Sequence, residues 1–377
     1  MLINASSICH YLIGKGMVSN EAVVDGDFTV IDRSGRNRNF KVIGRRNSGY
    51  FVKQIQQWDA QTIAMLQCEA ACYWLARNDG DFAVLAEALP EFYSYDLERN
   101  ILVSELLPES ENLYECFRRV GKLTPEITGR LGQLLGKCHR ALASVSYDGP
   151  ASAIFPRQLP WILSADQRNS HPFKELSQAT SELFDVVEGS AELRDGLDEL
   201  RGGWQTIALM HGDMRLENCV LVGDPGQEKW SLKIVDWELA DIGDPCWDIG
   251  GIIQACLSAC IMYLPMDSHM PTRQNWLPAN NLLNGMGATV QSLWENYVAA
   301  AETEPTGRLE RCLRYAAARM IQSAYEYVQF LPQVSPKAFH LLNLSSEIFN
   351  HPERVINLLF RSRSLNPICE NSWTKSC

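Results

Sequence analysis

The pattern of hydrophobic and polar positions changes about a third of the way along the chain. In the first third, short runs of apolar and β-branched residues predict strands at 27–32, 39–43 and 49–54. The segments between them, RSGRNR and GRRNS, are rich in turn-forming residues, so the three strands are expected to form a meander. A helix is predicted at 59–77, followed by a helical segment and two more strands, the second ending at 104–107.

From residue 112 onward, apolar residues recur at helical spacing. The residues that show it are Leu131, Leu134, Leu135 and Cys138, and later Leu309, Cys312, Leu313, Ala316, Met320 and Ala324. Two loop-rich stretches, 148–172 and 265–287, interrupt these helices, and irregular segments of this length often form lids or binding loops. The pattern predicts an α+β protein with a small β-rich lobe at 1–108, a larger helical lobe at 109–365 and a loose tail at 366–377.

One apolar stretch has two interpretations. Residues 249–266 carry no formal charge over eighteen positions, which is the lower limit for a helix that crosses a bilayer. Gln254, Ser258 and Pro265 weaken that interpretation. A helix that is apolar on all sides also suits the interior of a large protein, so we expect a buried core helix here.

Composition indicates a cytoplasmic globular enzyme without nucleic-acid or membrane partners. The chain has 377 residues, 46% of them hydrophobic and 21% charged, which is enough for two lobes with separate cores. The twelve cysteines are scattered and the N-terminus lacks a secretory signal, so reduced thiols are expected. A formal net charge of −11 disfavours nucleic acid and anionic membranes, and it mildly suits a cationic acceptor.

Two short motifs carry the candidate chemistry. In HGDMRLEN, four residues separate Asp213 from Asn218, and Asp236 follows eighteen positions later in KIVDWE. CVLV and SLKIV read as two strands joined by the turn GDPGQ, so Asp236 is expected at a strand end that faces Asn218. Transfer of a phosphoryl group needs a carboxylate to aim or deprotonate the attacking hydroxyl, and oxygen ligands for divalent cations. The order and spacing therefore favour a kinase.

The two motifs, followed by ADIGDPCWDIG, resemble those of the aminoglycoside phosphotransferase and choline kinase superfamily. The resemblance implies a bilobal protein-kinase-like fold and an enzyme that uses ATP and Mg²⁺. It implies that Asp213 is the catalytic base, that Asn218 and Asp236 bind Mg²⁺, and that His211 and Asp248 have structural roles in the catalytic loop. For Asp248, a simple cap of the following helix is an equal alternative.

The resemblance also implies a nucleotide site in the first lobe. Lys53 would neutralise the ATP phosphates and pair with Glu69 on the following helix. There is no GxGxxG, and Ser34 and Gly35 in the first hairpin turn are either a phosphate nest or an ordinary hairpin tip. Main-chain groups of the hinge between the lobes are expected to bond the adenine, and the residues concerned include Glu105 and Leu107.

The acceptor stays open at this point. Candidate contacts are Arg157, Trp161, Glu238 and Trp276, although the aromatic residues would serve equally well to pack the loops. The resemblance favours a small molecule such as an amino sugar or a choline-like amine. Some similar enzymes phosphorylate Ser or Thr of precursor peptides in lanthipeptide-like biosynthesis, beside a separate partner lyase, and YAAARMIQSAYE weakly resembles that group. A pseudokinase scaffold is the remaining alternative, which the presence of Lys53, Asp213, Asn218 and Asp236 disfavours.

Overall fold

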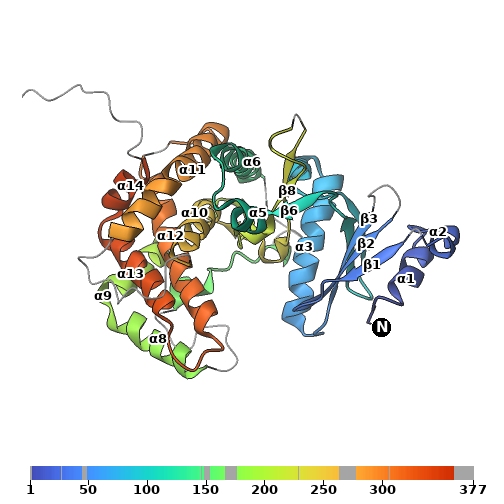
Figure 1. The fold of residues 1–377 in the computed structure, drawn as a ribbon, viewed down its shortest axis with the longest axis horizontal. Helices are drawn as coiled ribbons and strands as arrows, with labels where there is room; N and C mark the ends of the chain where they lie inside the picture. Colours follow the sequence, from blue (N-terminus) through green and yellow to red (C-terminus); the bar gives the residue numbers. More distant parts are fainter. Residues whose placement is uncertain are drawn as a thin grey trace, which may run out of the picture.

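The computed structural model describes residues 2–26, 28–44, 49–145, 147, 153–165, 176–227, 229–262, 277–304 and 306–360. Trp276 and the segment 366–377 lie outside these residues. Figure 1 shows a β-rich lobe that carries α1, α2 and α3 at one end of the molecule and helices α8 to α14 at the other, with α5, β6 and β8 between them. The fold is α+β and bilobal, as the sequence predicts.

The first lobe is built on a five-stranded antiparallel sheet with the order β1-β2-β3-β5-β4. Its strands are β1 (Thr29–Asp32), β2 (Asn37–Ile43), β3 (Gly49–Ile55), β4 (Phe92–Asp96) and β5 (Ile101–Glu105). The first three form the predicted meander. The second begins two residues earlier than predicted because Asn37 and Arg38 still pair with the end of β3.

Helices cover both faces of this sheet. Phe40, Val42 and Val52 point to one face, where they pack with α1 (Ile8–Gly14) in a small separate core. Side chains alternate along a strand, so Lys53 points to the opposite face, towards α3 (Ala60–Asn78). Asp59 caps α3 by accepting a hydrogen bond from the backbone N–H of Thr62. The alternation of β3 thus directs the candidate phosphate lysine towards α3.

The second lobe is mainly helical and contains two small sheets. The strands of the small sheets are β6 (Ser110–Asn112), β8 (Cys219–Val222) and β9 (Ser231–Ile234) in one, and β7 (Ala208–Met210) and β10 (Asp241–Gly243) in the other. The helices of this lobe are α5 (Leu113–Val120), α6 (Pro125–Ala143), α8 (Gln178–Gly189), α9 (Ala191–Gly202), α10 (Cys246–Met262), α11 (Leu277–Ala301), α12 (Arg308–Val328), α13 (Pro336–Asn350) and α14 (Pro352–Phe360). Two short helices, α2 (Asn20–Val24) and α4 (Leu85–Ala88), belong to the part of the chain before residue 109. Single 3₁₀ turns are η2 (Gly80–Phe82), η3 (Trp161–Ser164), η4 (Leu216–Asn218) and η5 (Trp237–Leu239).

The core of the second lobe surrounds α10, the helix formed by most of the uncharged stretch. Ile249, Ile252, Ile253 and Leu257 are fully buried, and α10 packs closely against α12. Among the described residues, no helix is both long and apolar enough to span a membrane. The core-helix prediction for this stretch is therefore confirmed over the part that the structure describes.

Candidate active site

The predicted catalytic loop, residues 211–218, links β7 to β8, and Asp248 holds its first residues in place. The Asp248 carboxylate accepts hydrogen bonds from the backbone N–H groups of His211 at 2.7 Å and Gly212 at 3.0 Å, and lies 3.2 Å from His139 Nε2. Burial raises the pKa of Asp248, but the interactions with His139 and His211 outweigh it and hold that pKa below its usual range. The alternative that Asp248 simply caps α10 is wrong, because Asp244 accepts the hydrogen bond from the backbone N–H of Cys246 at the start of that helix.

His211 ties the loop to the end of β9. Its Nε2 lies 2.9 Å from the carbonyl oxygen of Val235, and its Nδ1 accepts a hydrogen bond from the backbone N–H of Asp213 at 3.2 Å. Nε2 is then the protonated nitrogen that donates to Val235. Gly212 has φ +81°, and a Cβ there would lie 2.2 Å from the carbonyl oxygen of Leu239, so no other residue fits without a shift of backbone.

Asp213 is nearly buried and is compensated by two arginines. Its Oδ1 accepts hydrogen bonds from Arg215 at 2.8 Å and from Arg319 at 2.9 Å. Burial alone would raise the pKa of Asp213, but the guanidiniums of Arg319 and Arg215 outweigh it and hold the pKa well below its usual range. Asp213 is therefore ionised at neutral pH, and its position between cations makes it a weak base.

Asn218 and Asp236 lie on neighbouring stretches of backbone, as the strand prediction implies. The backbone N–H of Val235 donates to the carbonyl oxygen of Asn218 at 2.9 Å. The Asn218 side-chain N–H donates to the carbonyl oxygen of Asp213 at 2.9 Å. Asp236 has a left-handed conformation with φ 67°, unusual for a residue other than glycine, and a half-exposed side chain. Such backbone outliers concentrate at functional sites.

Lys53 lies at the junction of the two lobes, surrounded by carboxylates. Its Nζ is 2.7 Å from Glu69, in direct contact with Asp236 and 3.0 Å from Glu238. Burial lowers the pKa of Lys53, but the charges of Glu69 and Asp236 outweigh it and raise that pKa above its usual value. Oxygens of the three acids lie within 4.8 Å of one another. The predicted pairing of Lys53 with Glu69 is present, and the same lysine connects the first lobe to Asp236 in the second.

Glu238 lies with Lys53 rather than with the loops that we expected to shape the acceptor pocket. It is buried and also contacts Arg36 and the side chain of Asn37, both from the β1–β2 hairpin. In the hairpin turn, the backbone N–H of Ser34 donates to Asp32 and that of Gly35 donates to the carbonyl oxygen of Asn37. Both groups proposed for a phosphate nest thus have acceptors within the hairpin.

The hinge begins at the end of β5. The backbone N–H of Glu105 donates to the carbonyl oxygen of Glu91 at 2.8 Å, and the N–H of Leu106 donates to the carbonyl oxygen of Gly49 at 3.1 Å. In an extended segment, the backbone N–H and C=O groups of successive residues point to opposite sides of the chain. Glu105 therefore points its backbone groups away from β3.

The other expected acceptor contacts are only partly placed. Arg157 is exposed and has φ 62°, and its backbone N–H donates to Asp241 at 2.7 Å. Trp161 packs against Tyr325 of α12, with ring centroids 5.9 Å apart. Trp276 lies outside the described residues. Trp161 is therefore next to the helix that contacts Asp213, whereas the structure shows Arg157 in a backbone role.

Sequence reasoning missed the partners that the catalytic loop acquires from distant helices. His139 of α6 contacts Asp248, and Arg319 of α12 contacts Asp213. A signal for Arg319 is present in the sequence. It stands among Ala317, Ala318 and Met320 on a helix with an apolar face, and a charge in such a setting is rarely buried without a partner.

The comparison with protein families settles the classification. A family model described as "Phosphotransferase enzyme family" matches residues 27–277, which is more than half of the chain. The chain belongs to this family. This phosphotransferase is a kinase with an alcohol group as acceptor. That result sets aside the alternative of a scaffold without turnover.

Solved structures show the same fold at low sequence identity. A glucosamine kinase in complex with glucosamine, ADP and phosphate has a TM-score of 0.52 and 16% identity, with 95% of this phosphotransferase and 89% of that chain covered. Amicoumacin kinase hAmiN in complex with AMP-PNP, Ca²⁺ and Ami has a TM-score of 0.53 and 11% identity, with 90% and 95% covered. APH(2")-IIia in complex with GDP and kanamycin has a TM-score of 0.51 and 14% identity, with 91% and 99% covered. A comparison with curated protein sequences found no match.

Proposed function

We propose that this phosphotransferase moves the γ-phosphate of ATP, bound with Mg²⁺, to a hydroxyl group of a small molecule that carries an amine. The observation that carries the proposal is the contact of Lys53 with both Glu69 and Asp236. It joins the expected phosphate lysine of the first lobe to the expected metal ligand of the second. The catalytic loop with Asp213 is tied to the same strand end through His211 and Val235.

The donor atoms suit a magnesium ion. Mg²⁺ binds carboxylate and amide oxygens, and it usually keeps several waters beside one or two protein carboxylates and the substrate phosphates. Asp236 offers a half-exposed carboxylate, and the amide oxygen of Asn218 is left available by the hydrogen bond of its N–H to Asp213. When bound, the ion would neutralise charge that develops on the phosphoryl oxygens.

Nucleotide binding would change the partners of Lys53. Its ammonium contacts three carboxylates, which is more negative charge than one lysine neutralises. We infer that Lys53 keeps Glu69 and exchanges Asp236 for a phosphate oxygen. Arg36 would similarly leave Glu238 and turn to the phosphates. At the hinge, the carbonyl oxygen of Glu105 and the N–H of Leu107 would bond the adenine.

Asp213 would orient the acceptor hydroxyl and receive its proton late. Phosphoryl transfer passes through a loose transition state in which the attacking oxygen gains little bonding early, so a strong base is unnecessary. A carboxylate held by two guanidiniums fits this role. For the acceptor, the net charge of −11 suits an amine, and two of the structural neighbours are complexes with glucosamine and with kanamycin.

The decisive experiment is a phosphate-transfer assay. The protein would be incubated with labelled ATP and Mg²⁺ against amino sugars, choline-like amines, neutral sugars and precursor peptides with Ser or Thr, and mass spectrometry would locate the phosphate. Phosphate on the hydroxyl of an amine-bearing small molecule supports the proposal. Transfer to peptide alone would favour the peptide kinase instead, and no transfer to any acceptor would overturn the proposal.

A further inference from the structure

A closed ring of five side chains joins the catalytic loop to one face of α12. The ring consists of Asp213, Arg319, Gln322, Glu326 and Arg215. Arg319 donates to Asp213 Oδ1 at 2.9 Å and to Gln322 Oε1 at 3.3 Å. Gln322 Nε2 donates to Glu326 Oε1 at 2.8 Å, and the same Glu326 oxygen lies 3.9 Å from a guanidinium nitrogen of Arg215. Arg215 closes the ring by donating to Asp213 Oδ1 at 2.8 Å. The three α12 residues are spaced by three and four, so they share one face of the helix.

Arg319 is the buried member of this ring. Arg319 is only 4% exposed, and its guanidinium lies over the indole of Trp247, 5.4 Å from the centroid. It also donates to the carbonyl oxygen of Met214 at 3.3 Å. Trp247 in turn donates from its indole N–H to the carbonyl oxygen of Gly212 at 2.8 Å. Arg319 thus contacts the loop at the side chain of Asp213 and at the backbone oxygen of Met214. It also stacks on the indole of Trp247, which is itself hydrogen-bonded to the loop backbone at Gly212.

Both guanidiniums bond the same oxygen of Asp213. Oδ1 takes the hydrogen bonds from Arg215 and Arg319, so Oδ2 is the oxygen left to face an incoming hydroxyl. The planar fork of an arginine, fixed by stacking, restrains the rotation of a carboxylate more tightly than a flexible ammonium does. Arg215, on the loop itself, is partly exposed, whereas Arg319 is anchored in the helical core.

We propose that Arg319 is a positioning residue for phosphoryl transfer: anchored in α12 and stacked on Trp247, it holds Asp213 so that Oδ2 aims at the acceptor hydroxyl. The inference rests on the proposed role of Asp213 in the reaction. Its physical basis is preorganisation, because a small misplacement of a reacting group costs much of the rate.

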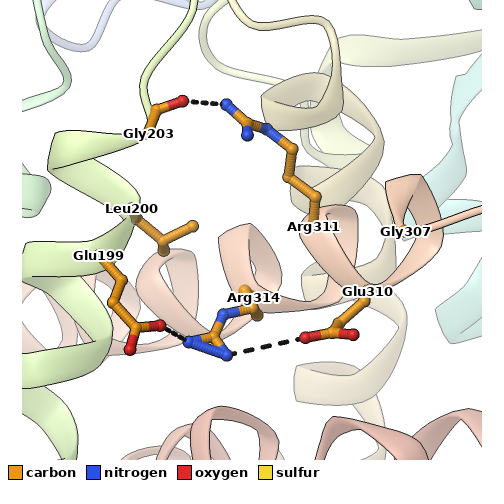
Figure 2. A pocket seen from close by; sticks show the side chains of 7 residues that line it. All are labelled: Glu199, Leu200, Gly203, Gly307, Glu310, Arg311 and Arg314. Carbon is orange, nitrogen blue, oxygen red and sulfur yellow. Dashed lines mark hydrogen bonds and ion pairs between the residues drawn. The ribbon is translucent and has the colours of Figure 1, made fainter.

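The test replaces Arg319 by methionine and uses a matched control on the same helix. Arg314 also carries a stacked guanidinium, 5.8 Å from the Phe349 centroid, but it pairs with Glu199 and Glu310. Figure 2 shows Arg314 beside a surface pocket, together with Arg311, which bonds the carbonyl oxygen of Gly203. Arg314→Met therefore repeats the chemical change and the loss of stacking at a site where Arg314 contacts none of the five residues of the ring around Asp213.

The first readout is the turnover rate with MgATP and the acceptor identified in the phosphate-transfer assay. The rate is divided by the concentration of folded protein. Arg319→Met is expected to lower kcat by on the order of a hundredfold, with the KM for ATP little changed. Arg319→Lys keeps a charge but lacks the planar fork that holds Asp213, so it should restore only a small part of kcat. Arg314→Met should leave both kcat and the KM for ATP unchanged.

The second readout needs no acceptor. In urea unfolding, Arg319→Met should lower the midpoint much more in the wild-type background than in Asp213→Asn, because the lost partner is the same carboxylate. Equal shifts of the midpoint in both backgrounds, or a kcat that matches that of Arg314→Met, would overturn the proposal. Full turnover in Asp213→Asn would instead defeat the proposed function, so the two failures are distinguishable.

Discussion

At the scale of single residues, each acid of the site has its charge compensated by a different kind of group. Asp213 bonds two guanidiniums, Glu69 and Asp236 share the ammonium of Lys53, and Asp248 accepts backbone N–H groups together with a histidine. These differences match the tasks that we assign. A carboxylate between cations stays ionised, one that shares a lysine can exchange partners, and one bonded to backbone fixes a loop.

Asp213→Asn tests the proposed reaction centre directly. The substitution keeps the size of the side chain but removes the negative charge that would accept the hydroxyl proton. We expect turnover to fall on the order of a hundredfold or more while nucleotide affinity stays nearly unchanged. Rates from the phosphate-transfer assay and nucleotide titration by calorimetry measure the two quantities. Turnover equal to that of the wild type would refute the assigned role.

Asp248→Ala tests the structural carboxylate. The change leaves the N–H groups of His211 and Gly212 buried without this acceptor, so we expect the free energy of unfolding to fall by about 3 kcal/mol. The pKa of Asp248 is lowered in the folded state, so its contribution is present above the unfolded pKa and is lost as pH falls through the folded pKa. The difference from wild type should therefore hold between pH 7 and about pH 4 and shrink below it, as followed by urea unfolding.

At the scale of elements, small residues allow helices to approach closely. Gly129, Gly132 and Gly136 lie on one face of α6, against α11. A Cβ at Gly132 would lie 2.1 Å from the carbonyl oxygen of Leu293, and at Gly136 it would lie 2.6 Å from that of Tyr297. Tyr297 also reaches His139, the partner of Asp248. The packing of α6 on α11 therefore supports the catalytic loop indirectly.

Gly132→Ala is expected to separate these helices. The added methyl group meets backbone rather than a flexible side chain, so α11 must shift, at a cost of about 1–3 kcal/mol in the free energy of unfolding. Gly14→Ala is a useful control because nothing lies within 4 Å of the added Cβ. Urea unfolding of both variants measures the effect. A Gly132→Ala protein as stable as the control variant would contradict the close packing.

At the scale of the whole molecule, charged contacts connect the two lobes across the nucleotide site. Lys53 of β3 reaches Asp236 and Glu238 after β9, and Arg36 of the first hairpin reaches Glu238 as well. The groups that would bind triphosphate and metal are the same groups that bridge the lobes. If nucleotide binds at this proposed site, we expect its binding to be coupled to the arrangement of the two lobes.

This coupling predicts a stabilisation by nucleotide that depends on Lys53. A ligand that binds only the folded state adds about 2.7 kcal/mol at a concentration a hundred times its Kd. We expect the non-hydrolysable analogue AMP-PNP with Mg²⁺ to raise the Tm of the wild-type protein. In Lys53→Met and Asp236→Ala the rise should be much smaller. Thermal unfolding with and without the nucleotide measures the shift, with Mg²⁺ alone as control. Equal shifts in all three proteins would argue against this site.

The sequence predicted the parts of the site that depend on local spacing. The loop from Asp213 to Asn218 and the two strands that carry Asp236 to its position lie within short, strongly patterned segments. These features follow from strand alternation and turn chemistry, which neighbouring residues specify by themselves. The pairing of Lys53 with Glu69 was instead implied by the family resemblance.

Only the tertiary structure decided which distant side chains complete the site. Arg319 lies 106 positions from Asp213, and Asp248 meets His139 from 109 positions away. Glu238 turned to Lys53 and Arg36 instead of the acceptor side, because the β1–β2 hairpin folds over the end of β9. The sequence alone determined the fold class and the order of the elements, and it predicted the reacting groups, since these are encoded in local patterns. The partners that fix their charge and direction arise from helix packing between remote segments, which no local pattern specifies.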